Sequence, residues 1–245
     1  MSRPYETERL TEDDLRSFTM CPRFHSFGGT NIYPITTQLL KLSTEKALTE
    51  CIRNDRLDPS MKYMKALLRS SKELELSKYY MDGQVLTMHN AVGMALGEVF
   101  GAFNANDFLP VFGPAPWSIK VSKSAIQITV SGILKTKTRT LHIIDFSPYQ
   151  DMHGIKNDPI IYLKAQTISQ FVKPWFNCSQ CVIHVFSLST ANTLLYHKLE
   201  SAEMDHLALT RIQRIVKAIE MKVDFPVLPC KRDCPFKSKC YLETI

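Results

Sequence analysis

The cysteines at the two ends of the chain place the strongest constraint on how it can fold. Three of the seven cysteines stand close together near the C-terminus, as Cys230, Cys234 and Cys240. A metal site held by thiolates needs a fourth ligand. Cys21, which follows a short predicted helix and precedes a proline, is the candidate. The spacing fits zinc and an iron–sulfur cluster equally well, and either would tie the two ends of the chain together.

The other cysteines are interpreted differently. Cys178 and Cys181 form a CxxC pair at the start of an apolar strand, where buried cysteine is common, so we expect packing rather than ligation. Cys51 falls on the apolar face of a predicted helix and is expected in the core. Disulfides are not expected, because the polar N-terminus has no secretory core and predicts a cytoplasmic protein, in a bacterium or a host cell. No stretch is apolar for long enough to span a membrane.

Hydrophobic periodicity predicts a helical first part and a mixed second part. Thr11 is an expected N-cap, with acids after it. The apolar spacing predicts helices at about 12–20, 37–54, 61–80, 84–103, 159–172 and 202–221. Alternating or continuous apolar runs predict strands at 117–121, 126–130, 141–146, 182–188 and 194–198.

Two phrases around the end cysteines carry a resemblance to a known family. The first is Ser17-Phe-Thr-Met-Cys21-Pro22, and the second is C-x3-C-x5-C after Phe225-Pro-Val-Leu-Pro. Together they resemble the iron–sulfur branch of the PD-(D/E)XK nucleases, the RecB- and AddB-like enzymes, in which the usual tail is C-x2-C-x5-C. The resemblance runs from about Leu10 to Cys240. It implies a [4Fe–4S] cluster on Cys21, Cys230, Cys234 and Cys240, with zinc as the alternative.

The resemblance also implies the fold. We expect an α/β protein with α+β-like order, whose PD-(D/E)XK nuclease-like core is a central mixed sheet flanked by helices. The whole chain, 1–245, is expected to be one RecB-like domain. A helical lobe is inserted at about 36–105, the sheet core covers about 117–222, and the cluster-binding tail covers 225–245.

The positions that match the nuclease motifs are degenerate. His89 can fill the place of the family's helix-borne histidine. In Gly132-Ile-Leu-Lys135, a lysine stands where the family has a metal-binding acid. In Asp145-Phe-Ser147 the acid is present, but a serine replaces the lysine. Gln166 fits the family's glutamine on the next helix, and Gln170 replaces its tyrosine.

These departures bear on catalysis, because hydrolysis in this fold needs Mg²⁺ or Mn²⁺ on several carboxylates and a lysine beside them. We therefore do not expect a bound Mg²⁺ or Mn²⁺, and Asp145 can instead pair with Lys135. A rearranged site is the alternative, with Lys164 in place of the missing lysine and Asp151 or Asp158 as the second carboxylate.

The net charge of +6 gives a small additional reason to expect nucleic-acid binding. Basic residues gather in the predicted hairpins, at Lys120, Lys123, Lys135, Lys137 and Arg139. A second group lies on the last helix, at Arg211, Arg214, Lys217 and Lys222. Candidates for base stacking are Trp117, Tyr149, Trp175 and Phe176. Solvated faces and core aromatics are the ordinary explanations of both patterns.

Three functions follow from these observations. The first is a catalytically inactive, cluster-containing protein that binds DNA, single-stranded or at a junction. Such a protein, of a phage-like or viral kind, would recruit or position a polymerase, a helicase or a recombination or transcription enzyme. The second is an active metal-dependent DNA exonuclease with rearranged ligands. The third is a protein-interaction scaffold with no DNA role.

Overall fold

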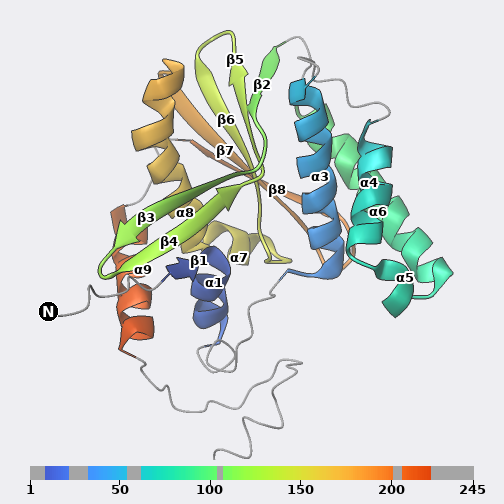
Figure 1. The fold of residues 1–245 in the computed structure, drawn as a ribbon, viewed down its shortest axis with the longest axis horizontal. Coiled ribbons are helices and arrows are strands. Elements are labelled where there is room, and N and C mark those ends of the chain that lie inside the picture. Colours follow the sequence, from blue (N-terminus) through green and yellow to red (C-terminus); the bar gives the residue numbers. More distant parts are fainter. Residues whose placement is uncertain (1–8, 22–32, 54–61, 104–106, 201–205, 222–245) are drawn as a thin grey trace, which may run out of the picture. The chain divides into compact units, whose positions relative to one another are not determined.

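The computed structural model describes residues 9–21, 33–53, 62–103, 107–200 and 206–221. The chain divides into two compact units. The first unit consists of Met1–Ile32, Trp117–Ile128 and His206–Ile245, and the second of Tyr33–Pro116 and Thr129–Asp205. Figure 1 shows a mixed α/β architecture, as expected from the sequence, but with two sheets where one central sheet was expected. Among the described residues, none of the helices combines the length and apolarity that crossing a lipid bilayer requires.

The smaller sheet, most of which belongs to the first unit, has three strands in the order β1-β4-β3. They are β1 (Arg9–Thr11), β4 (Ser124–Val130) and β3 (Ala115–Val121). Two helices complete this unit, α1 (Glu12–Met20) and α9 (His206–Glu220). Thr11 caps α1 as predicted, because its hydroxyl accepts from the Asp14 backbone N–H and its own N–H donates to the Asp14 carboxylate. Glu220 of α9 accepts from the Ser122 and Ser124 hydroxyls, which holds the β3–β4 turn to this helix.

The larger sheet belongs to the second unit and has five strands in the order β2-β5-β6-β7-β8. Their bounds are β2 (Phe108–Phe112), β5 (Gly132–Thr136), β6 (Thr140–Phe146), β7 (Gln180–Leu188) and β8 (Leu194–Glu200). Only the β6–β7 pair is parallel. A parallel pair needs a long crossover, and here it is made by α7 (Met152–Lys156), α8 (Pro159–Thr167), the π-helical turn η1 (Ile168–Val172) and the 3-10 turn η2 (Lys173–Phe176).

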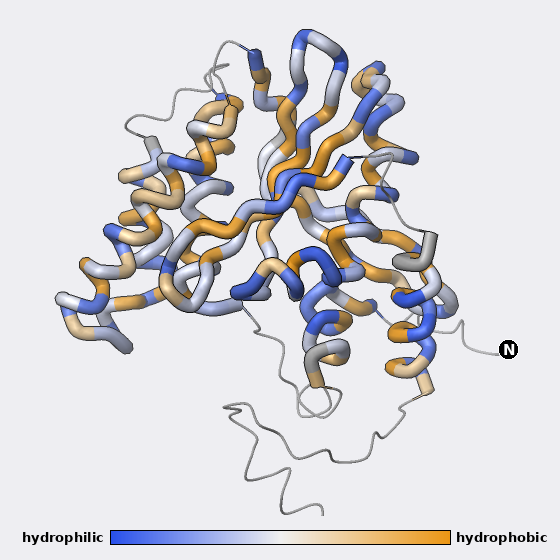
Figure 2. Tube along the Cα trace, turned by 180° about the vertical axis from the view of Figure 1, so that it is seen from behind, coloured by the Kyte–Doolittle hydropathy of each residue, from blue (hydrophilic) through white to orange (hydrophobic). Residues whose placement is uncertain are grey.

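Helices lie on both faces of the larger sheet (Figure 1). On one side are α3 (Ile35–Arg53), α4 (Lys62–Glu73), α5 (Leu76–Tyr79) and α6 (Asp82–Gly101), and on the other is α8. Strand β7 is buried at every position from Cys181 to Leu188, which is typical of a strand covered on both faces. Figure 2 shows the same property as continuous hydrophobic runs along the central strands.

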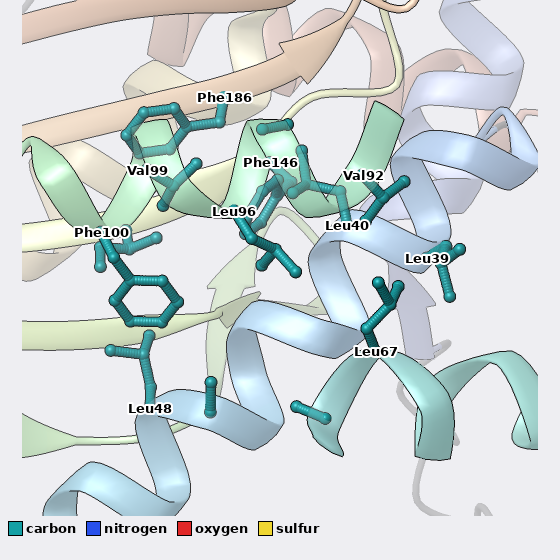
Figure 3. Packing of buried hydrophobic residues seen from close by; sticks show 14 of the residues in the cluster. Leu39, Leu40, Leu48, Leu67, Val92, Leu96, Val99, Phe100, Phe146 and Phe186 are labelled. Carbon is teal, nitrogen blue, oxygen red and sulfur yellow. The ribbon is translucent and has the colours of Figure 1, made fainter. Parts of the chain in front are cut away.

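The core of the second unit forms between the helical lobe and the sheet (Figure 3). Leu40 of α3 and Leu96 of α6 are fully buried, and they belong to one cluster with Phe146 of β6 and Phe186 of β7. Cys51 is part of the same cluster, which confirms that it is a core residue. The lobe and the sheet therefore share one hydrophobic core, and burial of this apolar surface stabilises both.

Most of the predicted elements are present, but strands β1, β2 and β5 and helix α7 were not predicted, and two of the predicted helices differ from the structure. The helix expected at 61–80 is two helices, separated at Leu74 and Glu75, where Glu75 has a left-handed backbone (φ 51°). The helix expected at 159–172 changes from α to π at Ile168. Strand β2 was missed because it contains Pro110, which a strand accommodates at the edge of a sheet.

Candidate functional site

A buried ion pair marks the carboxyl end of strand β6. Asp145 is 1% exposed, and its two carboxylate oxygens accept from the ammonium of Lys164 at 3.0 and 2.8 Å. Lys164 lies on α8 and is 0% exposed. Among charged groups, full burial is rare unless the group is paired and hydrogen-bonded. Both oxygens of Asp145, the atoms that would ligate a metal ion, thus accept hydrogen bonds from the Lys164 ammonium.

Helix α8 can hold a lysine this deeply because almost all of it is buried. The helix begins with Pro159 at its first position, after the N-cap Asp158, whose carboxylate accepts from the Ile160 N–H at 3.0 Å. A proline there costs no hydrogen bond and pre-sets the backbone. Six other residues of α8 are buried as well: Pro159, Ile160, Ile161, Leu163, Ala165 and Thr167.

The expected pairing of Asp145 with Lys135 is wrong, and Lys164 takes the place beside Asp145. Register places Lys135 opposite Leu141 and Gly132 opposite Ile144, so β5 carries Lys135 about 10 Å along the strand from the Asp145 end. The ammonium of Lys135 donates instead to the Phe176 carbonyl at 2.8 Å. The residue that lies beside Asp145 on the β5 side is Ser131, which directly precedes β5 and whose N–H donates to the Ile144 carbonyl at 3.0 Å.

Glu45 is a second carboxylate near this end of the sheet, and no sequence pattern singled it out. It lies on α3, half-buried, and its Oε1 accepts from the Ser131 hydroxyl at 2.7 Å. Burial raises the pKa of Glu45, and the charge of Asp145 raises it further, while Lys41, Ser131 and Lys164 oppose the shift. Glu45 and Asp145 therefore interact electrostatically, although each has its own hydrogen-bonding partner.

A cleft of about 390 Å³ is lined in part by Glu45. Residues of α3 and α4 line it, together with Pro114. Two ion pairs span it from helix to helix, Arg69 with Glu50 at 2.6 Å and Lys46 with Glu73. Solvent can approach Glu45 through this cleft, whereas the Asp145–Lys164 pair lies outside its lining.

The remaining residues of the expected nuclease site do not converge on Asp145. The two acids considered as extra ligands cap helices, Asp151 through the Gly154 N–H at 2.7 Å and Asp158 as described above. His89 is hydrogen-bonded to Ser71 of α4 at 2.8 Å. Ser147 is buried, and Gln166 is half-buried on α8. In the part of the chain that the structure describes, no group of three His, Cys, Asp or Glu side chains could hold a metal ion.

The cysteines fall into two classes. Cys21 ends helix α1, where its N–H donates to the Ser17 carbonyl at 2.9 Å, and its thiol is free and half-buried. Cys230, Cys234 and Cys240 lie outside the described residues. Cys178 is half-buried and Cys181 is buried, and burial raises the pKa of both thiols, that of Cys181 to about 12. Since the thiolate is the ligating form, this pair fits packing better than ligation.

The basic residues expected to contact DNA are divided between the units. Lys120 and Lys123 are exposed on the first unit. On α9 of the same unit, Arg211, Arg214 and Lys217 are also exposed, and Lys222 lies outside the described residues. Lys135, Lys137 and Arg139 belong to the second unit, where Lys135 is half-buried and the other two are exposed. Of the four aromatic candidates, Trp175 is exposed, and Trp117, Tyr149 and Phe176 are half-buried.

A chain of two histidines and a tyrosine crosses three strands of the larger sheet, and sequence reasoning missed it. His142 Nδ1 lies 2.8 Å from His184 Nε2, and His184 Nδ1 lies 2.8 Å from the Tyr196 hydroxyl. Phe103 and Phe108 pack edge-on against the imidazoles. Burial, aided by the charge of Lys198, lowers the pKa of His142 to about 4. Burial, aided by His142 and Lys198, lowers the pKa of His184 to about 3.

This histidine pair predicts a loss of stability in mild acid. Because the folded-state pKa values lie below the unfolded value of about 6.5, the unfolded chain takes up protons first as pH falls. After discounting the half-exposed His142 for solvent screening, we expect the free energy of unfolding to drop by on the order of 3 kcal/mol between pH 6.5 and pH 4. Urea unfolding at several pH values between 6.5 and 4 measures this drop, and the His142→Gln variant should show a smaller dependence of the free energy of unfolding on pH. Equal slopes for the parent and His142→Gln would contradict the prediction.

Comparisons with known proteins add little to this geometry. No family model matches the chain, and no curated protein matches it. A solved structure titled "Crystal structure of SSO0001" is similar to it, with 14% sequence identity and a TM-score of 0.41. The match covers 96% of this chain and 87% of that one.

Proposed function

We propose that this protein is a nuclease-like fold that has lost its nuclease centre and binds DNA as an accessory factor. The observation that carries the proposal is the contact of the Lys164 ammonium with both oxygens of Asp145, with both side chains buried. The proposed partners are single-stranded or junction DNA and a polymerase, a helicase or a recombination or transcription enzyme that works on it.

The ligand chemistry supports the loss of hydrolysis. Mg²⁺ binds carboxylate oxygens at about 2.0–2.1 Å in a near-octahedral shell, and usually needs more than one carboxylate. At this site the Asp145 carboxylate already accepts from the side-chain ammonium of Lys164, and the Glu45 carboxylate accepts from the Ser131 hydroxyl. Burial also raises the pKa of Glu45, which disfavours its charged form. A divalent cation would have to displace the fully buried Lys164 ammonium from Asp145.

We also propose that Cys21, Cys230, Cys234 and Cys240 hold a [4Fe–4S] cluster that joins the chain ends. The thiol of Cys21 fits this assignment, because it is free, half-buried and fixed at the end of a capped helix. Four thiolates are the donor set of such clusters. When bound, the cluster would supply a covalent cross-link between the two ends, and the role we assign to it is structural.

An active nuclease is the second candidate, and one contact favours it. Lys164 reaches Asp145 from the following helix, which is the replacement expected if the catalytic lysine had moved from position 147. The second carboxylate of such a site would be Glu45, since Asp151 and Asp158 serve as helix caps. In this case Mn²⁺ would compete with Lys164 for Asp145.

The test uses the full chain, purified without oxygen, and end-labelled single-stranded, double-stranded and forked DNA. We expect salt-dependent binding and no cleavage with Mg²⁺ or Mn²⁺, because the site that would hold the metal is filled. Cleavage that disappears in the Glu45→Gln variant would overturn the loss of the nuclease centre. Cleavage that persists in that variant points to a contaminating nuclease, and the protein is then repurified. If the protein shows no salt-dependent binding to any of these DNAs, the proposal fails and the third function, a protein-interaction scaffold with no DNA role, is favoured.

A further inference from the structure

The turn between β5 and β6 is fixed in place at the end of the sheet that lies away from Asp145. The Arg139 N–H donates to the Thr136 carbonyl at 3.1 Å, and Arg139 has a left-handed backbone (φ 63°). The Arg139 carbonyl then accepts from the Ser179 N–H at 2.9 Å. These bonds tie the turn to the segment that follows η2, so the turn is a rigid support for its side chains.

We call the place where the β5–β6 turn meets the segment after η2 the junction, and positive side chains lie on both of these segments. Lys135 donates to the Phe176 carbonyl at 2.8 Å, and Lys173 donates to the Ser179 carbonyl at 3.4 Å. Burial raises the pKa of the Cys178 thiol, and the positive charges of three residues oppose this shift: Lys135, Arg139 and Lys173. These three side chains therefore lie near the thiol. Lys137 adds a fourth cation at the exposed tip of the turn. Acids at this end of the sheet include Asp107, whose neighbour Phe108 pairs with Thr136, and Glu200, which pairs with Val182 in the ladder and forms an ion pair with Lys198 at 2.7 Å.

Two large rings are exposed beside these cations. Trp175 of η2 is 76% exposed, and Phe171 of η1 is 59% exposed. Trp175 stands in the chain between Lys173 and Phe176, both of which are tied into the junction. The indole of Trp175 is thus available to stack on a ligand, and its chain neighbours Lys173 and Phe176 are held in place by hydrogen bonds.

We propose that this end of the larger sheet is a binding surface for single-stranded nucleic acid. Trp175 and Phe171 stack on bases, while Lys137, Arg139 and Lys173 contact the phosphates. Combined aromatic and cationic groups are the means by which proteins bind single strands without reading sequence. A duplex keeps its bases stacked internally and offers these rings no partner. The inference rests on the proposed DNA binding and assigns it a place.

The position of this surface also fits a role in binding rather than cleavage. Thr140, at the start of β6, pairs with Gln180, whereas Asp145 lies near the other end of the same strand. Five residues of β-strand span about 17 Å. A strand stacked on Trp175 would therefore lie away from the Asp145–Lys164 pair rather than across it.

The test measures fluorescence anisotropy of labelled 20-nucleotide oligo-dT, oligo-rU and duplex DNA with the full chain at several salt concentrations. We expect Trp175→Ala to weaken single-strand binding roughly 5- to 150-fold. Arg139→Asn keeps a residue that tolerates the left-handed backbone and should lower the salt slope by about 0.7. Matched controls lie on the helical lobe, Tyr79→Ala for an equally exposed ring (74%) and Lys65→Ala for an exposed lysine.

Each outcome bears on the inference in a different way. Weakening by Trp175→Ala and Arg139→Asn, with the two controls unchanged, supports it, and the ratio of oligo-dT to oligo-rU affinity names the natural strand. Binding by the parent that neither variant weakens overturns this surface, while the proposed DNA binding stands elsewhere on the chain. Duplex bound as tightly as oligo-dT overturns the preference for single strands. A parent that binds no nucleic acid overturns both proposals together.

Discussion

Replacing Asp145 by alanine is expected to destabilise the protein by about 3–5 kcal/mol, because it leaves the ammonium of Lys164 buried without its partner. Removing one member of a buried pair has a much larger effect than removing both, since the isolated charge must be desolvated alone. Urea unfolding of the parent and the variant at pH 7 measures the difference. A loss below about 1 kcal/mol would show that water reaches the pair.

Two controls separate burial of a charge from loss of a contact. The double variant Asp145→Leu with Lys164→Met replaces the pair by apolar groups of similar size and should recover most of the lost stability. Glu50→Ala breaks the exposed pair with Arg69, 2.6 Å long, and should change stability by no more than about 1 kcal/mol. If Glu50→Ala were as damaging as Asp145→Ala, burial would not explain the effect.

Replacing Cys240 by serine is expected to give a chain that lacks iron and is unstable or insoluble. Metal ligation at a structural site contributes on the order of 10 kcal/mol to folding, which is comparable to the whole stability of a typical domain. Iron content, the visible absorption of protein purified without oxygen, and thermal melting measure the effect. The Cys21→Ser variant should behave in the same way, because both thiolates are proposed ligands of one cluster.

The matched control for this experiment is Cys178→Ser, since Cys178 is also half-buried but is interpreted as a packing residue. It should retain the iron and the absorption of the parent. A soluble Cys240→Ser protein with the parent's melting temperature would contradict the proposed link between the chain ends. A colourless parent that contains zinc would keep the four ligands and replace the cluster.

Local signals in the sequence were sufficient for most elements of the fold. The N-cap at Thr11 and the apolar spacing of the long helices predicted α1, α3 and α6 close to their bounds. These signals act over one or two turns, so they survive without tertiary information. Strand β2 was missed, because its proline, Pro110, is compatible with a strand at the edge of a sheet, and the local sequence pattern does not reveal the order of strands.

The candidate site was harder to predict, because its contacts join distant parts of the chain. Lys164 was considered as a neighbour of Asp145, but its pairing depends on the crossover from β6 to β7. Lys135 was assigned to the same place by motif spacing, and the register of β5 moves it away. Glu45 carried no signal at all, since an acid beside buried helix positions looks the same whether it faces solvent or a neighbouring strand.

The parallel pairing of β6 with β7 has a consequence for the order of folding. Thr140 and Gln180 are partners in this ladder, forty residues apart in the chain, and α7 and α8 lie between them. Closing so long a loop must precede any gain from the ladder, so pairing of this kind forms slowly. Until it forms, the apolar run from Cys181 to Leu188 stays open to other chains. Slow pairing of β6 with β7 would therefore leave the centre of the larger sheet exposed to aggregation while the chain folds.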